Sequence, residues 1–270
     1  MMTGILQDLK NSPIFRRNGL ILKKEKLGSV CVAMCVHRGI DPQAFKLLSL
    51  LQACPDPQVF TMVQQGDALI DRSRAIVASR FLENTECDVL FFLDDDIIYN
   101  PKEVIKISQL MLKDDRLDIV GGAYMVKTDK NPHFAIKTLD DKPLIFGENG
   151  AIEEVMYVST GFMGIHRRVI QKMVDSGKFP LCHPNDFRFY PFFKPTEKQV
   201  EGNWIYMSED WAFCDRAREL GSKIWVDTTV KLGHAGRYVY DWDNILQAPK
   251  SDVKNLEYWE NGGAGQAKAA

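Results

Sequence analysis

Residues 88–101 read DVLFFLDDDIIYNP, an apolar run that ends in three consecutive carboxylates and is followed by a helix start. The five apolar residues 89–93 are typical of a strand buried on both faces of a parallel sheet. Asp94, Asp95 and Asp96 then fall at the carboxyl end of that strand, where open α/β sheets bind their ligands. Because neighbouring carboxylates repel one another in a partly desolvated site, we expect a cation between them. A divalent metal that also contacts substrate phosphates suits this position.

Strands and helices alternate through the first half of the chain. Hydrophobic patterns and turn residues predict strands over residues 29–36, 58–63, 89–93 and 117–121. They predict helices over residues 41–51 and 68–82, and a third helix that starts at Asn100-Pro101. Such alternation is typical of right-handed βαβ units. We therefore predict the α/β fold class, with a Rossmann-like, mixed but mostly parallel central sheet flanked by helices.

The second half of the chain has a different character. The pattern predicts short strands at residues 134–137, 155–158 and 223–226, and helices at residues 166–175 and 208–220. Residues 180–203 hold prolines, aromatic and charged residues without a clear period, which we interpret as a functional loop over a site.

No internal repeat or Pro/Gly/Ser-rich linker divides the chain. We therefore predict one main domain over residues 28–240. It follows an N-terminal arm, residues 1–27, and precedes a C-terminal extension, residues 241–270, with a flexible tail.

Composition limits the class of protein and its location. The chain has 270 residues, a formal net charge of −2 and a pI near 6.2, so it carries no overall basic field for nucleic acid. No apolar run approaches the ~20 residues that cross a bilayer, and no secretory signal is evident. Six scattered cysteines in mostly apolar segments favour free thiols in a reducing compartment. We predict a cytoplasmic protein without a transmembrane segment, and its oligomeric state stays open.

The tripeptide Ser208-Glu209-Asp210 opens one of the predicted helices. One interpretation is structural, because a serine cap and acids in the first turn stabilise a helix. The other is that a carboxylate projects from the helix start into the site. There it would act as a general base on an attacking hydroxyl.

His234 and Arg74 are further candidates, each with a structural alternative. Glycines near His234 allow close backbone approach around the imidazole, which is a common metal ligand. If the strand before His234 ends at the same sheet edge as Asp96, one metal could take both side chains. Otherwise His234 is a structural or surface residue. Arg74 is either solvated or paired, or it contacts a diphosphate, whose oxygens suit a planar guanidinium.

These clusters, in this order, resemble the nucleotide-sugar-dependent glycosyltransferases with the GT-A fold, especially their family-two-like group. That group has a helix with an arginine, a strand ending in DxD, a GG strand, an acceptor-side GxGFM segment, an xED helix and a downstream histidine. The matching elements are, in order, Arg74, residues 89–96, residues 119–122, residues 159–168, residues 208–217 and His234. The resemblance covers roughly residues 28–240. One departure is that the first strand ends in CVHR, residues 35–38, where relatives often carry a proline-threonine pair.

The resemblance implies a metal-dependent transfer of a sugar from a nucleoside-diphosphate sugar to an acceptor hydroxyl, with Mn²⁺ or Mg²⁺ as cofactor. Asp94, Asp96 and His234 would hold the metal. Asp210 would be the catalytic base of an inverting transfer, and Glu209 would orient the acceptor. The nucleotide-sugar would be bound by Arg74, Asp94, Asp95 and His37.

The resemblance leaves the substrates open. A UDP-sugar is the expected donor, and the acceptor is a glycan, a lipid-linked glycan, a protein or a modified nucleic acid. The aromatic residues of segment 180–206 either stack a sugar or a base, or pack as an ordinary loop.

Two other classes of protein are alternatives. A sugar-phosphate nucleotidyltransferase normally carries a glycine-rich, basic phosphate loop after its first strand, whereas residues 36–40, VHRGI, contain one glycine. A non-catalytic nucleotide-sugar or glycan-binding protein on the same fold is the second alternative. The joint presence of Asp94, Asp96, Asp210 and His234 argues against it.

Overall fold

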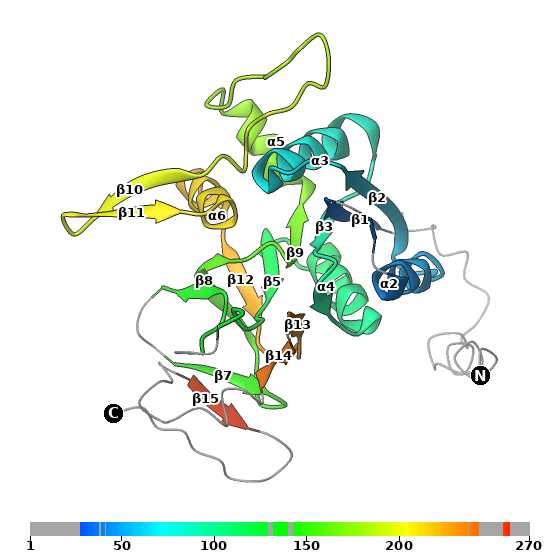
Figure 1. Ribbon diagram of the computed structural model, residues 1–270, viewed down its shortest axis with the longest axis vertical. Helices are drawn as coiled ribbons and strands as arrows, with labels where there is room; N and C mark the ends of the chain where they lie inside the picture. The colour runs from blue at the N-terminus through cyan, green and yellow to red at the C-terminus, as the bar shows by residue number, and fades with distance from the viewer. Residues whose placement is uncertain are drawn as a thin grey trace, which may run out of the picture.

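Eight strands form the main sheet, in the order β2-β1-β3-β9-β5-β12-β8-β6 (Figure 1). The computed structural model describes residues 28–37, 39–40, 42–128, 132–139, 143–236 and 238–242, and the backbone of residues 256–259. The strands of the main sheet are β2 (Gln58–Gln65), β1 (Ser29–Val36), β3 (Val89–Leu93), β9 (Phe162–His166), β5 (Ile119–Gly122), β12 (Ile224–Asp227), β8 (Ile152–Val158) and β6 (Ile136–Thr138).

Helices flank this sheet, and the remaining described strands form three smaller sheets, β10-β11, β14-β13-β4 and β15-β7. The helices are α2 (Pro42–Gln52), α3 (Ile70–Asn84), α4 (Pro101–Lys113), α5 (Arg167–Asp175) and α6 (Glu209–Glu219). The remaining strands are β4 (Ile97–Ile98), β7 (Leu144–Gly147), β10 (Thr196–Val200), β11 (Asn203–Met207), β13 (Gly233–Ala235), β14 (Val239–Tyr240) and β15 (Leu256–Trp259). The predicted α/β class, with a mixed central sheet flanked by helices, is confirmed.

The prediction of mostly parallel pairing is wrong. β1 pairs in parallel with β2 and β3, and β12 pairs in parallel with β5. The contacts of β9 with β3 and β5, and those of β8 with β12 and β6, are antiparallel. These two strands run against all the others in the sheet. Because each lies between two strands of the opposite direction, most neighbouring pairs are antiparallel.

The main sheet separates two hydrophobic cores. Alternate residues of a strand point to opposite faces, so one buried strand contributes to both cores. Leu90 and Phe92 of β3 join the core that includes buried residues of α3, α5 and α6. Val89, Phe91 and Leu93 join the core that includes buried residues of α2 and α4, which lie side by side in Figure 1. Complete burial of β3 explains its continuous apolar sequence.

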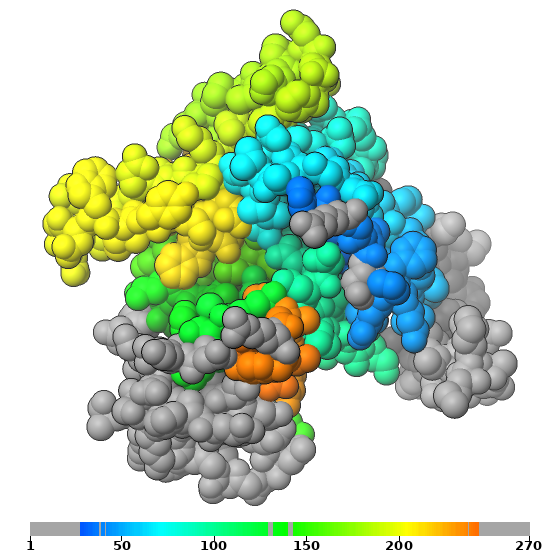
Figure 2. Space-filling view, viewed as in Figure 1, coloured from blue at the N-terminus to red at the C-terminus, as the bar shows by residue number. Residues whose placement is uncertain are grey.

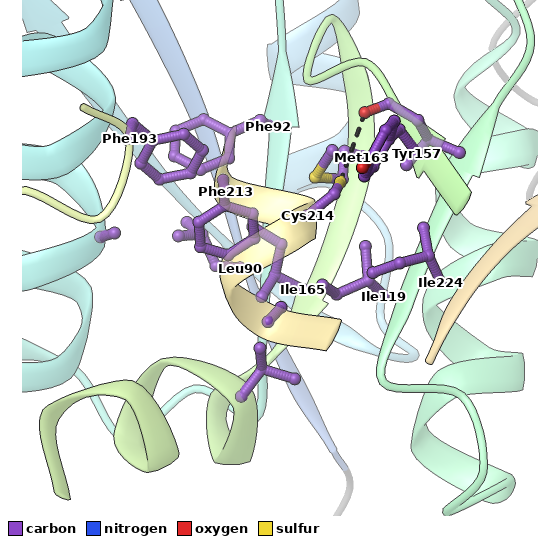
Figure 3. Packing of buried hydrophobic residues seen from close by; sticks show 14 of the residues in the cluster. Leu90, Phe92, Ile119, Tyr157, Met163, Ile165, Phe193, Phe213, Cys214 and Ile224 are labelled. Atoms are coloured by element: carbon purple, nitrogen blue, oxygen red, sulfur yellow. Dashed lines mark hydrogen bonds between the residues drawn. The ribbon is translucent and has the colours of Figure 1, made fainter. Parts of the chain in front are cut away.

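An aromatic stack ties α6 to the sheet. The ring of Phe213 in α6 stacks on Phe193 with 4.3 Å between centroids, and Phe193 meets the edge of Phe92 in β3 at 5.6 Å. Figure 3 shows these three rings together beside the α6 ribbon. All three side chains are buried. The position of α6, which begins with Glu209 and Asp210, therefore depends on core packing.

Several local predictions agree with the structure. The bounds of β1 and β3 are as predicted, and α4 begins at Pro101 with the Asn100 side chain accepting a hydrogen bond from the backbone N–H of Lys102. The predicted cap of α2, Asp41, lies outside the described residues. All six cysteines are free, as expected. None of the described helices combines the length and the apolar character needed to cross a bilayer.

The interpretation of residues 180–203 as one irregular loop is wrong in its second part. β10 and β11 form an antiparallel hairpin over residues 196–207. Its two-residue turn, Glu201-Gly202, has positive φ at both positions (50° and 82°), as type I′ hairpin turns require. The hairpin was missed because β10 is mostly polar and β11 is, after its first residue, a continuous run of aromatic and apolar residues that are mostly exposed, so neither strand has the alternating pattern of a half-buried strand.

We expect Phe213→Ala to destabilise the fold by about 3–5 kcal/mol, because a buried ring is lost and a cavity remains beside Phe193. Denaturant unfolding would measure the change. Phe45→Ala is the matched control, since Phe45 on α2 is 61% exposed, and it should change stability by less than about 0.5 kcal/mol. Equal effects of the two changes would contradict the proposed anchoring of α6.

Candidate active site

A pocket of about 240 Å³ opens at the carboxyl edge of the main sheet. Its lining includes His37 after β1, Asp67 before α3, Arg74 of α3 and the acidic triplet 94–96 after β3. From β1 the chain passes through α2 to β2 on one side, and returns through α3 to β3 on the other side. The carboxyl end of β1 is therefore a topological switch point, where open α/β sheets bind ligands.

Arg74 connects carboxylates from two distant parts of the chain. Its Nη2 atom donates to both oxygens of Asp94 at 2.9 Å, and its Nη1 atom donates to Oε1 of Glu209 at the start of α6. Arg74 is 4% exposed. The guanidinium therefore holds the acidic end of β3 and the N-terminus of α6 on opposite sides of one buried cation.

The charged groups of this network stabilise one another. Burial opposes the charge of Arg74, but Asp94 and Glu209 outweigh it and raise the pKa of Arg74. Burial also raises the pKa of Glu209, with a further contribution from Asp210, while Arg74 lowers it in part. Without the guanidinium, carboxylates would face one another in a poorly solvated site.

Asp96 and His234 lie together beside this network. β13 pairs with β4, directly after the triplet, and the N–H of Ala235 donates to the carbonyl oxygen of Asp96 at 2.7 Å. The His234 Nε2 atom lies 3.5 Å from Oδ2 of Asp96. Its Nδ1 atom lies 2.8 Å from the carbonyl oxygen of Met125, which assigns a hydrogen to Nδ1. Nε2 then faces Asp96, where it donates to the carboxylate if the imidazole is protonated and offers its lone pair to a metal if the imidazole is neutral. Metal-binding histidines are commonly oriented in this way.

The Asp96 carboxylate attracts cations. Its Oδ2 atom accepts a hydrogen bond from the Nζ of Lys127. Burial tends to raise the pKa of Asp96, but the contacts with His234 and Lys127 outweigh burial and lower it to about 2. The carboxylate is therefore ionised at neutral pH and available to a metal.

The residues fit a divalent ion that is held by two protein ligands. Asp96 supplies a carboxylate and His234 an imidazole, whereas both oxygens of Asp94 contact Arg74. Across the described ranges, no three His, Cys, Asp or Glu side chains converge as a metal site. An ion at Asp96 and His234 would therefore need water and substrate oxygens as its other ligands, as Mg²⁺ commonly does. The metal role of Asp94, Asp96 and His234 stays a prediction.

Asp210 is the second acid of α6 and is buried. Its Oδ1 atom accepts hydrogen bonds from the Ser208 hydroxyl and from the backbone N–H of Trp211, the latter at 2.8 Å. Ser208 precedes the helix but its side chain makes no capping bond to the backbone. These contacts fix the orientation of the Asp210 carboxylate, which is the requirement for a positioned base.

Tyr124 lies between the carboxylates and the end of β9. Burial raises its pKa, and Asp94 and Asp210 raise it further, so the phenol stays neutral. Its oxygen accepts the N–H of Gly161 at 3.2 Å, and a Cβ at Gly161 would approach that oxygen to 2.6 Å. A glycine is therefore required at position 161 for this contact.

The other predicted site residues lie nearby. His37 and Asp95 line the pocket and are exposed, and Arg38 lies outside the described residues. Sequence reasoning missed Lys127 and Tyr124, which contact the site from the segment after β5. No local pattern marks these two residues, and only their position after the GG strand could have suggested them.

Arg74→Met should destabilise the protein by about 3–5 kcal/mol, because it leaves two partly buried carboxylates without their cation. Denaturant unfolding at neutral pH would measure this. Arg72→Met is the matched control two residues away. The Arg72 side chain is 42% exposed and pairs with Asp67, so its loss should cost less than about 1 kcal/mol. A similarly small effect for Arg74 would refute the bridging role.

Asp96 should make stability depend on pH in metal-free protein. Because its pKa is lower in the folded protein than in the unfolded chain, its ionised form stabilises the fold above about pH 4. This contribution is lost as the pH falls toward 2. Since the side chain is 39% exposed, we expect only about 1 kcal/mol. The stability difference between wild type and Asp96→Asn should therefore shrink between pH 4 and pH 2, and a constant difference over this range would contradict the assignment.

The sequence matches no known protein family and no curated protein. Among solved structures, the chain is similar to the crystal structure of A197 from STIV. The identity is 17%, the similarity covers 77% of this chain and 86% of that chain, and the TM-score is 0.48. Similarity at this level adds nothing to the chemistry of the site.

Proposed function

We propose that the protein is a metal-dependent glycosyltransferase of the GT-A type, which transfers a sugar from a nucleoside-diphosphate sugar to an acceptor hydroxyl with inversion. A UDP-sugar is the proposed donor. The observation that carries this proposal is the meeting of three separate elements beside the pocket that Arg74 and the acidic triplet line. The acidic end of β3, the acids of α6 and His234 of β13 come together around Arg74 and Asp96.

The pocket side of this arrangement suits a nucleotide diphosphate. Its position at the switch point of the sheet is typical of nucleotide sites. Asp96 and His234 are the side chains that we assign to a divalent metal. A bound Mn²⁺ or Mg²⁺ would supply Lewis-acid stabilisation of the charge on a diphosphate leaving group. We assign Asp95 and His37, which line the same pocket, to contacts with the nucleotide.

The α6 side suits proton transfer. Both hydrogen bonds to the Asp210 carboxylate go to Oδ1, and we assign Oδ2 to accept the proton of the attacking hydroxyl. Glu209 is paired with Arg74, so it is the poorer base of the two and is assigned to acceptor orientation. A base on one side and a leaving group on the other is the arrangement that inversion requires.

The test is nucleotide release from UDP-, GDP- and TDP-sugars, with and without Mn²⁺. Wild type should release nucleotide in a metal-dependent reaction. Asp96→Ala should abolish this metal-dependent release. Asp210→Asn should lower the transfer rate by about 10²–10⁴-fold, because a general base is lost. Donor binding, measured by the thermal shift with Mn²⁺ and nucleotide, should persist in Asp210→Asn.

Asp114→Asn is the control, because Asp114 caps the distant end of α4 and pairs with Arg116. Its transfer rate should equal that of wild type. A full rate in Asp210→Asn would refute the assigned base. Pyrophosphate release from a nucleoside triphosphate and a sugar phosphate would identify a nucleotidyltransferase instead. Nucleotide-sugar binding without any turnover would identify a binding protein.

A further inference from the structure

The β10–β11 hairpin presents two different faces. Residues directly opposite each other in an antiparallel pair share a face. Lys198 lies opposite Ile205, and its Nζ contacts both carboxylate oxygens of Asp215 in α6 at 2.7 and 2.8 Å. Met207, two residues after Ile205, is buried. This inner face is therefore attached to the body of the protein, and Figure 2 shows the hairpin standing out from it in yellow.

The outer face carries two exposed aromatic rings among polar side chains. Trp204 is 71% exposed and Tyr206 is 74% exposed, more than any other large apolar side chain in the described ranges. Gln199 lies opposite Trp204, and Glu197 lies opposite Tyr206. The tight Glu201-Gly202 turn holds this face in one conformation.

Other aromatic residues of segment 180–206 behave differently. Phe189, Phe192 and Phe193 are buried, so for them the interpretation as ordinary packing is correct. The two rings of β11 are not explained by packing against the described residues. Two large rings side by side on one strand form a contiguous exposed apolar surface, which is typical of an interaction site.

We propose that the outer face of the hairpin binds a chain of neutral pyranose sugars. The flat rings of Trp204 and Tyr206 match the apolar C–H face of a pyranose. The Glu197 carboxylate accepts hydrogen bonds from sugar hydroxyls, and the Gln199 amide both donates and accepts them. The two rings are two residues apart on one strand, about 7 Å, so together they form a continuous platform.

The charge of this face disfavours anionic ligands. Glu197 and Glu201 are acidic, whereas Lys198 points to the inner face and is paired with Asp215. An acidic surface repels the phosphates of nucleic acid and of a nucleotide donor. It also repels anionic lipid, which attracts basic side chains.

The size of this face argues against a stable dimer through the hairpin alone. Its two strands have five residues each, so each is only about 17 Å long. A standard protein interface needs about 800 Å² from each partner. A sugar chain, in contrast, is narrow enough to be held by two rings.

The hairpin leads directly into the candidate catalytic helix. Tyr206 precedes Asp210 by four residues, and β11 contacts α6. If the proposed function holds, the bound sugar chain is the acceptor, and its end lies toward the assigned base. This assignment as acceptor rests on the proposed function, whereas sugar binding by the hairpin does not.

Binding would be tested by titration calorimetry and saturation-transfer NMR with maltohexaose, cellohexaose, chitohexaose and mannohexaose, without metal or nucleotide. Wild type should bind at least one of them. The double variant Trp204→Ala/Tyr206→Ala should bind it at least about ten-fold more weakly, because both stacking surfaces are lost. Trp204→Phe keeps a ring and should retain most of the affinity. Phe45→Ala, a comparably exposed ring on α2, should bind as wild type does.

Unchanged melting temperatures would show that all variants are folded. Failure of every sugar to bind wild type, or equal binding by the double variant, would overturn the proposal. The proposal would also be overturned if wild type bound phosphatidylglycerol vesicles or self-associated, and the double variant lost that property while it still bound sugar. Sugar binding without nucleotide-sugar turnover would refute the proposed function alone. Turnover whose rate and acceptor KM are the same in the double variant and in wild type would refute the assignment of the bound sugar chain as acceptor, and would leave the proposed function intact.

Discussion

A buried guanidinium connects the two halves of the candidate site. Arg74 contacts Asp94 from the end of β3 and Glu209 from the start of α6, residues that are 115 positions apart in the chain. Each carboxylate alone would be unfavourable in this poorly solvated place, and the two together would repel. The cation makes their proximity possible. The relative position of the nucleotide side and the base side therefore depends on this single side chain and on the aromatic packing behind α6.

The site combines rigid and adjustable parts. Asp94 and Glu209 are held by a buried partner, and Asp210 is oriented by the start of its own helix. Asp96, in contrast, shares its carboxylate between His234 and the flexible side chain of Lys127. An ammonium group on a long stem can move aside when a metal arrives, whereas the Arg74 network cannot rearrange without unpairing buried charges. The Arg74 network and Asp210 are therefore held in fixed positions, as the proposed proton transfer needs. Asp96 and Lys127 can rearrange where a metal and its substrate would enter.

Sequence patterns were sufficient to predict the bounds of strands that are almost completely buried. β1 and β3 are continuous apolar runs, so both were predicted with the observed bounds. β9 was not predicted as a strand, because its Gly164 is required by close contact with Met111 and Phe91, which are distant in sequence. The acidic triplet, Arg74 and His234 could be chosen by residue type and order. The distance between His234 and Asp96 could not, since it depends on the non-local pairing of β13 with β4.

The order of strands also has a consequence for synthesis of the protein. β9 lies between β3 and β5, although both of these precede it in the chain. β1, β2 and β3 can therefore pair with one another early, but β5 stays separate from β3 until residues 162–166 have left the ribosome. α6, with both of its acids, emerges later still. The growing chain must hold unpaired strand edges during elongation, a state in which aggregation competes with folding. Because of this strand order, the candidate site can assemble only late in the synthesis of the chain.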